Sequence, residues 1–378
     1  MVTYADLGVR RVINAHNTLT MLGGSIMLPA VRAAMDEAAG QFVDMAELAR
    51  AASDRVAALT RNEDALIVGS ASAGLMLSAL AAMTGDDQRR LWQVLEYGAG
   101  ALGRREIIIQ RAHRIPYDNV LTLAGAQVVE VGNAIQTFGW ELEAAVTPRT
   151  AAILYVAGEH LTEAALPLEE VLEIAQAAPV PVIVDGAAQL PPRENLWRFT
   201  QAGAAVALFS GGKEIRGPQA SGLMVGKKEF LDAVRMHAFP WQRFGRVAKV
   251  GKEETIGLLT ALELWLERDL DADLRRAEAV TAQWVRAWSE IDAVDAVRDW
   301  PGEAGRPMPR VRLQWPAGSY PPAAAIAEQL AAGTEPIVVF VADPRAIWLN
   351  AELVDDADVQ TVTRRVTEAF TRAGGAGR

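Results

Sequence analysis

The sequence predicts an α/β fold built on a mostly parallel sheet that helices cover on both faces. Short apolar, β-branched runs recur between residues 64 and 226, and helical patterns such as 74–85 and 168–178 lie between several of them. These runs are too apolar for strands with one face in water, which is typical of buried parallel strands. Ligands of such a sheet bind at the carboxyl ends of its strands. The expected strands are DALIV (64–68), EIIIQ (106–110), QVVEV (127–131), AAILYV (151–156), VPVIVD (180–185), AVALFS (205–210) and SGLMVG (221–226).

The pattern changes after about residue 245. Two long helical patterns, 252–270 and 271–291, precede three apolar runs and a last helical pattern at 359–374. Long helices with a few strands indicate a smaller α+β domain. We expect a helical N-terminal segment (1–44) that packs on the small domain or a partner subunit, a large α/β domain (45–244) and a small domain (245–378). The strands expected in the small domain are RVRLQW (310–315), PIVVFVA (336–342) and AIWLN (346–350).

Composition excludes several classes of function. The formal net charge of −10 argues against a standing partnership with nucleic acid. There is no cysteine, and the four histidines are scattered without an HExxH motif, so we expect no metal site. The N-terminus carries charges where a secretory signal needs an apolar run, and no apolar stretch approaches the roughly 18 to 20 residues that span a bilayer. We therefore expect a soluble, cytoplasmic protein.

Two glycine motifs do not fit the nucleotide sites they suggest. In SGGKE, residues 210–214, the phosphate-binding P-loop pattern GxxxxGK[ST] needs glycine at Ala207 and a hydroxyl residue at Glu214. Both positions fail. The stretch GAGALG, residues 98–103, matches GxGxxG, but it leads into an expected strand rather than a helix. It is better interpreted as a loop.

A third motif is a better anion site. GSASAG, residues 69–74, directly follows an expected strand and opens a helix. Small residues let backbone N–H groups approach an anion at a helix N-terminus, and Ser70 and Ser72 add hydroxyl groups. A simple N-cap by serine is the alternative interpretation.

Two further residues complete a set with this motif. Asp185 ends an apolar strand, and Lys213 follows the next strand along the chain. Pyridoxal phosphate (PLP) requires a carboxylate at its pyridine nitrogen, a lysine for its Schiff base and a helix terminus for its phosphate. The sequence therefore predicts a PLP site.

At this point the chain resembles a known family. Several phrases are similar to those of the selenocysteine-synthase-like group of fold-type-I PLP enzymes, which includes D-glucosaminate-6-phosphate ammonia lyase. The resemblance extends from about residue 9 to the strand at 346–350 and implies the fold-type-I architecture. The phrases are VINAHNTLTMLGGS, QFVDMAELARAA, QRAHRIPYDNV, VDGAAQLPPRENLWRFTQAGA, FSGGKEIRGPQASGLMVGKKE and KVGKEE.

The resemblance implies roles for individual residues. Lys213 would carry the Schiff base and Asp185 would pair with the pyridine nitrogen. Ala187 would lie against one ring face, while His113 would cover the other face or orient the substrate. The resemblance also implies at least a homodimer. The remaining cofactor-binding candidates are Ser70, Ala71, Ser72 and Ser210 at the phosphate, and Lys252 in a loop that reaches an active site, perhaps that of the neighbouring subunit.

Two departures from the family pattern bear on the substrate. His16 stands where the family usually has a smaller residue, and it would lie near the substrate entrance. Glu214 replaces the glycine that usually follows the Schiff-base lysine. The chain starts at the VINA segment, without the N-terminal region with which selenocysteine synthases bind tRNA. We therefore expect a small-molecule amino-acid substrate.

The chemistry of PLP favours a lyase. Lys213, once released, is a base positioned at the substrate Cα, and a hydroxyl leaving group at Cβ would then depart by α,β-elimination, giving a 2-oxo acid and ammonia. The substrate would be a hydroxylated amino acid or an amino-sugar acid. Arg216, Arg114 or Arg345 would bind its carboxylate or phosphate. Arg216 in a surface or interface salt bridge is the alternative.

Other functions stay open at this level. A racemase or aldolase shares the first step, and His113 or His16 could supply a second base; both histidines could also be purely structural. From another class, the chain could be a selenium- or tRNA-handling transferase, or a non-catalytic PLP-fold binding protein. Such a binder would be expected to have lost Lys213 or Asp185, and both are present.

Overall fold

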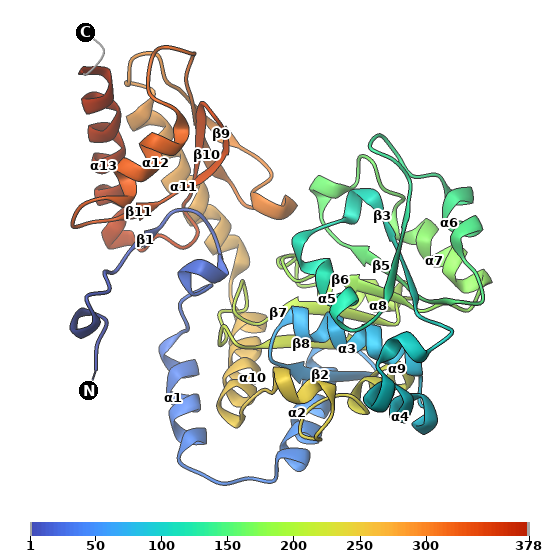
Figure 1. Ribbon diagram of the computed structural model, residues 1–378. Coiled ribbons are helices and arrows are strands. Elements are labelled where there is room, and N and C mark those ends of the chain that lie inside the picture. The colour runs from blue at the N-terminus through green and yellow to red at the C-terminus, as the bar shows by residue number, and fades with distance from the viewer. Residues whose placement is uncertain (1, 376–378) are drawn as a thin grey trace. The chain divides into compact units, whose positions relative to one another are not determined.

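The computed structural model describes residues 2–375, which form two compact units (Figure 1). The large unit runs from Ser25 to Arg268, and the C-terminal unit combines the residues up to Gly24 with those from Asp269 onward. These bounds differ from the domain boundaries expected at residues 44 and 244. The difference arises because helices α1 (Pro29–Ala39) and α10 (Lys252–Glu267) pack against each other within the large unit.

A seven-stranded sheet forms the centre of the large unit. The five neighbours β7, β6, β5, β3 and β4 are parallel, whereas β8 is antiparallel to both β7 and β2. The expected mostly parallel α/β sheet is confirmed. In spatial order the strands are β2 (Asp64–Val68), β8 (Gly222–Gly226), β7 (Val206–Ser210), β6 (Val182–Asp185), β5 (Thr150–Val156), β3 (Glu106–Gln110) and β4 (Gln127–Val131).

Helix α3 (Ala71–Thr84) is the most deeply buried helix next to this sheet. Its residues from Ala73 to Thr84 are buried with one exception, Met76, because the helix is apolar on all sides. A Cβ on Gly74 would lie 3.3 Å or less from the side chains of Leu208 and Met224, so this glycine lets the helix approach the sheet. The other α-helices of the unit are α2 (Met45–Thr60), α4 (Gln88–Tyr97), α5 (Asn119–Leu123), α6 (Gly139–Ala145), α7 (Leu168–Ala177), α8 (Asn195–Gln201) and α9 (Lys228–Arg235).

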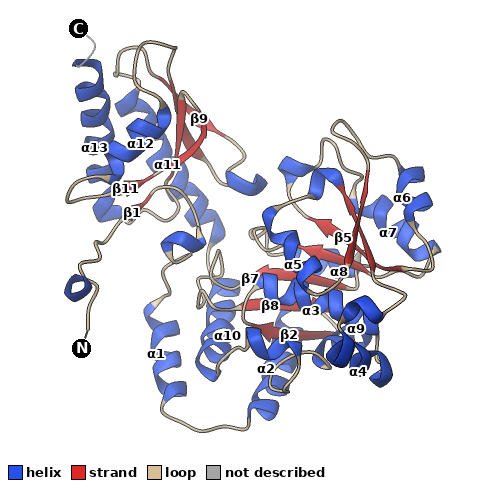
Figure 2. Cartoon of the chain, in the orientation of Figure 1, coloured by secondary structure: helices blue, strands red, loops and turns tan. Residues whose placement is uncertain are grey.

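The C-terminal unit contains a four-stranded antiparallel sheet and three helices (Figure 2). Two of its strands escape prediction. β9 has the polar sequence DAVRD, and β1 has only two residues, which pair in parallel with β11. The sheet order is β12 (Phe340–Asp343), β13 (Ala346–Asn350), β10 (Arg310–Gln314) and β9 (Asp295–Asp299); the other elements are β1 (Ile13–Asn14), β11 (Ile337–Val338), α11 (Leu270–Trp288), α12 (Ala323–Ala331) and α13 (Asp356–Gly375).

One face of this small sheet forms the core of the C-terminal unit. Val311 and Leu313 of β10 are fully buried together with Trp284 and Trp288 of α11 and the inward side chains of α12 and α13. Side chains alternate along a strand, so the neighbouring residues Arg310, Arg312 and Gln314 point to the opposite face. The helices therefore cover one face of the sheet.

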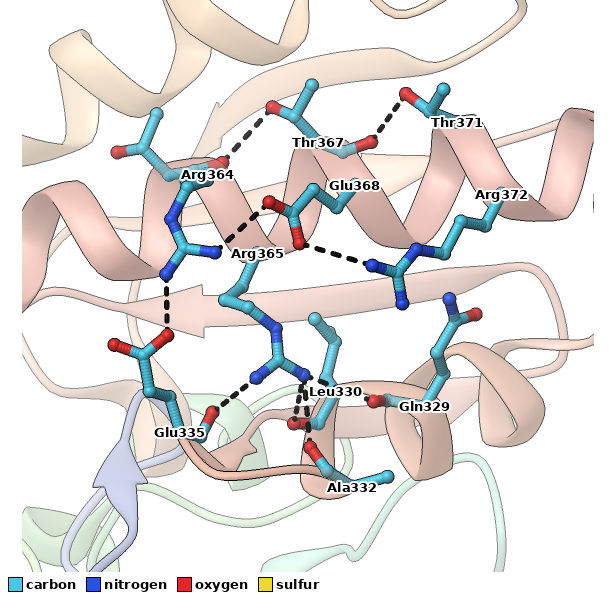
Figure 3. A network of polar contacts seen from close by, with 11 residues as sticks. Gln329, Leu330, Ala332, Glu335, Arg364, Arg365, Thr367, Glu368, Thr371 and Arg372 are labelled. Carbon is cyan, nitrogen blue, oxygen red and sulfur yellow. Dashed lines mark hydrogen bonds and ion pairs between the residues drawn. The ribbon is translucent and has the colours of Figure 1, made fainter.

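A polar network joins α13 to the end of α12 (Figure 3). The Arg365 guanidinium donates to the carbonyl oxygens of Glu335 at 2.9 Å and Ala332 at 3.0 Å, and at longer range to those of Gln329 and Leu330. It thereby satisfies carbonyl groups that the last turn of α12 leaves without intrahelical partners.

Short 3-10 turns connect many of these elements. They are η1 (Ala5–Leu7), η2 (Thr20–Leu22), η3 (Ala99–Ala101), η4 (Arg111–His113), η5 (Pro116–Asp118), η6 (Glu159–Leu161), η7 (Phe244–Ala248) and η8 (Glu303–Gly305). Within residues 2–375, no helix has both the length and the apolar character needed to cross a membrane. The same residues contain no group of three or more His, Asp or Glu side chains placed to hold a metal ion.

Candidate active site

Lys213 lies on a tight turn after β7, held by close backbone contacts. The N–H of Gly211 donates to Ser221 O at 3.0 Å, and a Cβ on Gly211 would lie 2.1 Å from Ser221 Oγ. A Cβ on Gly212 would lie 2.6 Å from the Cα of Gln219. The two glycines are therefore required for close approach. Arg216, whose N–H donates to Lys213 O at 3.0 Å, adopts the left-handed region at φ 56°, a conformation that non-glycine residues seldom adopt.

Asp185 ends β6, the parallel neighbour of the strand that leads to Lys213. The residue is 8% exposed, and its Oδ1 accepts a hydrogen bond from the Ala187 N–H at 3.0 Å. Burial raises the pKa of Asp185, while the bond from Ala187 and the charge of Lys213 oppose that rise. A buried carboxylate in this state is stabilised by a nearby cation.

The backbone at the start of α3 packs directly against strand β8. A Cβ on Gly222 of β8 would lie 2.4 Å from Ser70 C and 2.6 Å from Ala71 N. The Ser70 hydroxyl caps the helix by accepting from the Ala73 N–H at 3.0 Å. The N-cap interpretation is therefore correct for Ser70. The cap satisfies one of the first N–H groups of the helix, and Ala71 and Ser72 stay partly exposed at its N-terminus.

His113 follows β3 at the same edge of the sheet and is 1% exposed. Its Nδ1 accepts a hydrogen bond from the Val156 N–H at 3.3 Å, and its ring lies edge-on to Tyr155 at 4.5 Å. Burial first, and then the charge of His160, lower the pKa of His113 to about 4. The ring is therefore neutral at pH 7, with its proton on Nε2.

Ser210 and Lys252 occupy different surroundings. The Ser210 N–H donates to Ala187 O at 3.4 Å, which connects the end of β7 to the segment after Asp185. Lys252 donates from Nζ to Ala38 O at 2.7 Å and Ala39 O at 3.0 Å and pairs with Glu253. Within its own chain, Lys252 therefore caps the C-terminus of α1.

The remaining predicted substrate residues are held by acids or belong to the other unit. Arg114 binds Asp118 at 2.6 Å and also pairs with Glu130. Arg345 and His16 belong to the C-terminal unit. Arg345 is exposed beside an open pocket of about 880 Å³ that includes Asp292 and Trp315.

Glu214, which sequence reasoning left without a role, is buried. It is 8% exposed, its Oε1 accepts a hydrogen bond from Trp265 Nε1 at 3.2 Å, and Arg268 Nη1 lies 3.7 Å away. Both partners come from the end of α10. Glu214 therefore does not face solvent. Its contacts with Trp265 and Arg268 connect the Lys213 turn to the C-terminal end of α10.

The strand-end positions of Lys213, Asp185, His113 and the start of α3 define the edge of the sheet at which parallel α/β folds bind ligands. The family model described as "SelA: L-seryl-tRNA selenium transferase" matches residues 12–282. The chain belongs to this family.

Three relatives illustrate its range. The chain is 32% identical to D-glucosaminate-6-phosphate ammonia lyase of Salmonella typhimurium, over 82% of this chain and 81% of that protein. It is 31% identical to 5'-C-glycyluridine monooxygenase-decarboxylase of a Streptomyces species, over 99% of this chain and 93% of that protein. It is also 31% identical to the L-seryl-tRNA(Sec) selenium transferase of Solidesulfovibrio magneticus, over 76% of this chain and only 61% of that protein.

Solved structures agree with the fold. A structure of D-glucosaminate-6-phosphate ammonia-lyase superposes with a TM-score of 0.84 at 29% identity and covers 99% of this chain and 100% of the other. A serine palmitoyltransferase of Sphingomonas wittichii gives a TM-score of 0.61 at 14% identity, covers 97% of this chain and 89% of the other, and shows the fold alone. The expected fold-type-I architecture is confirmed.

Proposed function

We propose that this protein is a PLP-dependent lyase that catalyses α,β-elimination on a hydroxylated amino acid or an amino-sugar acid. The observation that carries the proposal is the buried Asp185 beside Lys213 on neighbouring strands, together with the similarity to an ammonia lyase over most of the chain. The names of the other relatives indicate different substrates. The proposed reaction type therefore rests on two observations together, the positions of Asp185 and Lys213 and the similarity to the ammonia lyase.

The residues present fit the cofactor. Asp185 is a buried carboxylate with a raised pKa, and a protonated pyridine nitrogen would supply the cation that stabilises its ionised form. The N-terminus of α3 offers backbone N–H groups and the Ser72 hydroxyl to a phosphate. The close contact between Gly222 and Ser70 fixes that N-terminus against the sheet.

When bound, PLP supplies an electron sink for the negative charge that develops at the substrate Cα. Lys213 provides the amine that takes the Cα proton. Asp185 holds a proton at the pyridine nitrogen by remaining ionised. His113 is neutral at pH 7 because burial lowers its pKa to about 4, so it presents an Nε2–H donor and not a charge. Arg216, three residues after Lys213 and on the same turn, is the proposed ligand of the substrate carboxylate.

A second candidate function comes from another relative, which matches nearly the whole chain. The similarity to 5'-C-glycyluridine monooxygenase-decarboxylase covers 99% of this chain at nearly the same identity. An oxygen-dependent decarboxylase would use the same Lys213 and Asp185 but would consume O₂ and release CO₂. Racemisation and aldol cleavage also begin by breaking a bond at the substrate Cα. Their products distinguish them from elimination.

The first experiment tests the cofactor. Purified protein should show an absorbance band near the violet edge of the visible, which Lys213→Ala abolishes and Asp185→Asn shifts. Lys227→Ala, at an exposed lysine of the same unit, is the matched control and should leave the band unchanged. A colourless protein that takes up no PLP would contradict the proposal.

The second experiment tests the reaction. A panel of D- and L-hydroxy amino acids and amino-sugar acids should be assayed for 2-oxo acid, ammonia, O₂ consumption, CO₂ and exchange of the Cα hydrogen in heavy water. Ammonia and 2-oxo acid in equal amounts without O₂ consumption support the lyase. O₂ consumption with CO₂ supports the second candidate, and hydrogen exchange without ammonia supports a racemase.

We also propose that the protein is a cytoplasmic homodimer that binds a small amino-acid substrate. Phe42 and Ile26 of the large unit are exposed large apolar side chains, which a second copy would cover. Sedimentation of the wild-type protein against Phe42→Asp tests the dimer. A monomeric wild-type protein would refute it.

A further inference from the structure

The outward face of the small sheet in the C-terminal unit carries a row of side chains that are not part of the core between the sheet and the helices. Direct cross-strand partners place Phe340 of β12, Trp348 of β13, Arg312 of β10 and Val297 of β9 in one line across all four strands. Partners opposite each other in a sheet point to the same face. This line, with Arg310 two residues before Arg312, forms what we call the outward row.

The aromatic side chains of the outward row contact Arg310 and His16. Arg310 lies 5.7 Å from the centroid of the Trp348 ring and 6.0 Å from that of Phe340. His16 meets the Phe340 ring edge-on at 5.1 Å. The face therefore gathers two arginines and a histidine around two aromatic rings, although the chain as a whole is acidic.

Two of these three basic side chains have an acidic neighbour. Arg310 Nε binds Asp299 Oδ2 at 2.8 Å, and Trp348 Nε1 donates to the same oxygen at 2.8 Å. His16 Nδ1 lies 3.5 Å from Glu303 Oε2. Asp299 therefore compensates the charge of Arg310.

Arg312 is different. It is partly buried, and its Nε has no solvent access and no hydrogen-bond partner. Among residues 2–375, no carboxylate, carbonyl or hydroxyl oxygen accepts a hydrogen bond from its guanidinium group. Buried polar groups in folded proteins are nearly always paired, and an unpaired guanidinium with an inaccessible N–H is unfavourable. The row thus contains a donor that lacks an acceptor.

We propose that Arg312 binds an oxyanion, the carboxylate or phosphomonoester group of a small ligand, on the outward row. A guanidinium donates two parallel N–H bonds to such a group, and a flanking aromatic ring restricts its orientation. Trp348 flanks Arg312 across the strand pair, and Arg310 adds a second cation on the same face. The net charge of −10 favours a small anion over a polyanion as the ligand.

Arg312 is not one of the arginines that the sequence suggested as ligands of the substrate. Arg114 is held by two acids, and Arg345 is exposed on the turn before β13. No sequence motif surrounds Arg312, because its lack of a partner appears only when the strands are paired. The site lies within the C-terminal unit and stands or falls independently of the proposed lyase activity.

The test compares thermal unfolding of the full-length, PLP-saturated protein in sodium phosphate, sodium acetate and sodium chloride at equal ionic strength. The wild-type protein should show a Tm increase on the order of 2–4 °C in phosphate or acetate relative to chloride. Arg312→Gln should lose this increase. A response to phosphate alone identifies a phosphomonoester ligand, and a response to acetate alone identifies a carboxylate.

Two controls separate this site from a general effect. Arg286→Gln removes an exposed arginine of α11 and should retain the full response. In chloride, Arg312→Gln should be at least as stable as the wild-type protein, because it removes an uncompensated charge. A purely structural arginine would give the opposite result, a lower Tm in every buffer.

Arg312→Lys keeps the charge but not the two parallel donors, and should retain less than half of the response. It also keeps the test decisive if Arg312→Gln fails to fold. An equal response in the wild-type protein and the Arg312 variants, or no response of the wild-type protein to either anion, would overturn the proposal.

Discussion

Replacing Glu214 by alanine should destabilise the large unit more than any single surface change. The carboxylate is 8% exposed, accepts the indole N–H of Trp265 at 3.2 Å and faces Arg268 at 3.7 Å. Breaking a buried ion pair by removing one partner costs about 3–5 kcal/mol. The Arg268 side chain is 23% exposed, so water partly compensates it and the cost should fall below that range. We expect a loss of about 2–3 kcal/mol.

Glu214→Gln separates charge from hydrogen bonding. Its amide oxygen can still accept from Trp265, so this variant should lose only about 1–2 kcal/mol. Urea unfolding followed by tryptophan fluorescence measures both values, provided the slope with urea is unchanged. Glu267→Ala, at an exposed acid of α10 near the same helix end, is the matched control and should stay within about 0.5 kcal/mol of the wild-type protein. The reasoning is refuted if Glu214→Ala matches this control, or if the glutamine variant is as unstable as the alanine variant.

Three further predictions concern the scaffold. His237 is buried against Thr84, and burial first, then Arg243, lowers its pKa to about 4. The unfolded chain therefore binds a proton that the folded chain excludes, and stability should fall as the pH drops from about 6.5 toward 4, less steeply in His237→Gln; urea midpoints across this range would show it. Gly222→Ala places a Cβ 2.4 Å from Ser70 C, so Tm and PLP affinity should both fall in thermal and equilibrium titrations, and an unchanged affinity would contradict the assigned phosphate site. Arg365→Ala removes the donors at the end of α12 and should cost about 1–2 kcal/mol in urea unfolding, against no change for Arg286→Ala.

The parts of the fold that the sequence predicts are those in which local composition decides the structure. The strands of the large sheet are continuous apolar runs, so their order along the chain, and hence the strand-end positions of Asp185 and Lys213, could be predicted. β9 could not, because DAVRD is polar at three of its five positions and lacks the alternation typical of a strand, so its ladder to β10 supplies the stability.

Partners distant in sequence have no local signal. Trp265 donates to Glu214 across 51 residues, and neither residue lies in a pattern that indicates the other. The same holds for Lys252, whose contacts with the carbonyls of Ala38 and Ala39 follow from the packing of α10 on α1. Arg312 is the clearest case, since a residue without a partner can be recognised only when every neighbour is known.

The two relatives that match most of the chain show why fold and cofactor do not determine the reaction. One is named an ammonia lyase and the other a monooxygenase-decarboxylase, and their identities to this chain differ by a single percentage point. The residues that would hold the cofactor, Lys213 and Asp185, are needed for either chemistry. What selects the reaction must therefore lie in residues that contact the substrate and not the cofactor. In this chain the best candidate is Arg216, which shares the Lys213 turn and adopts a left-handed backbone conformation. A substitution at Arg216 should change which acids are turned over while the visible absorbance of the bound cofactor stays the same, whereas a substitution at Asp185 should change both.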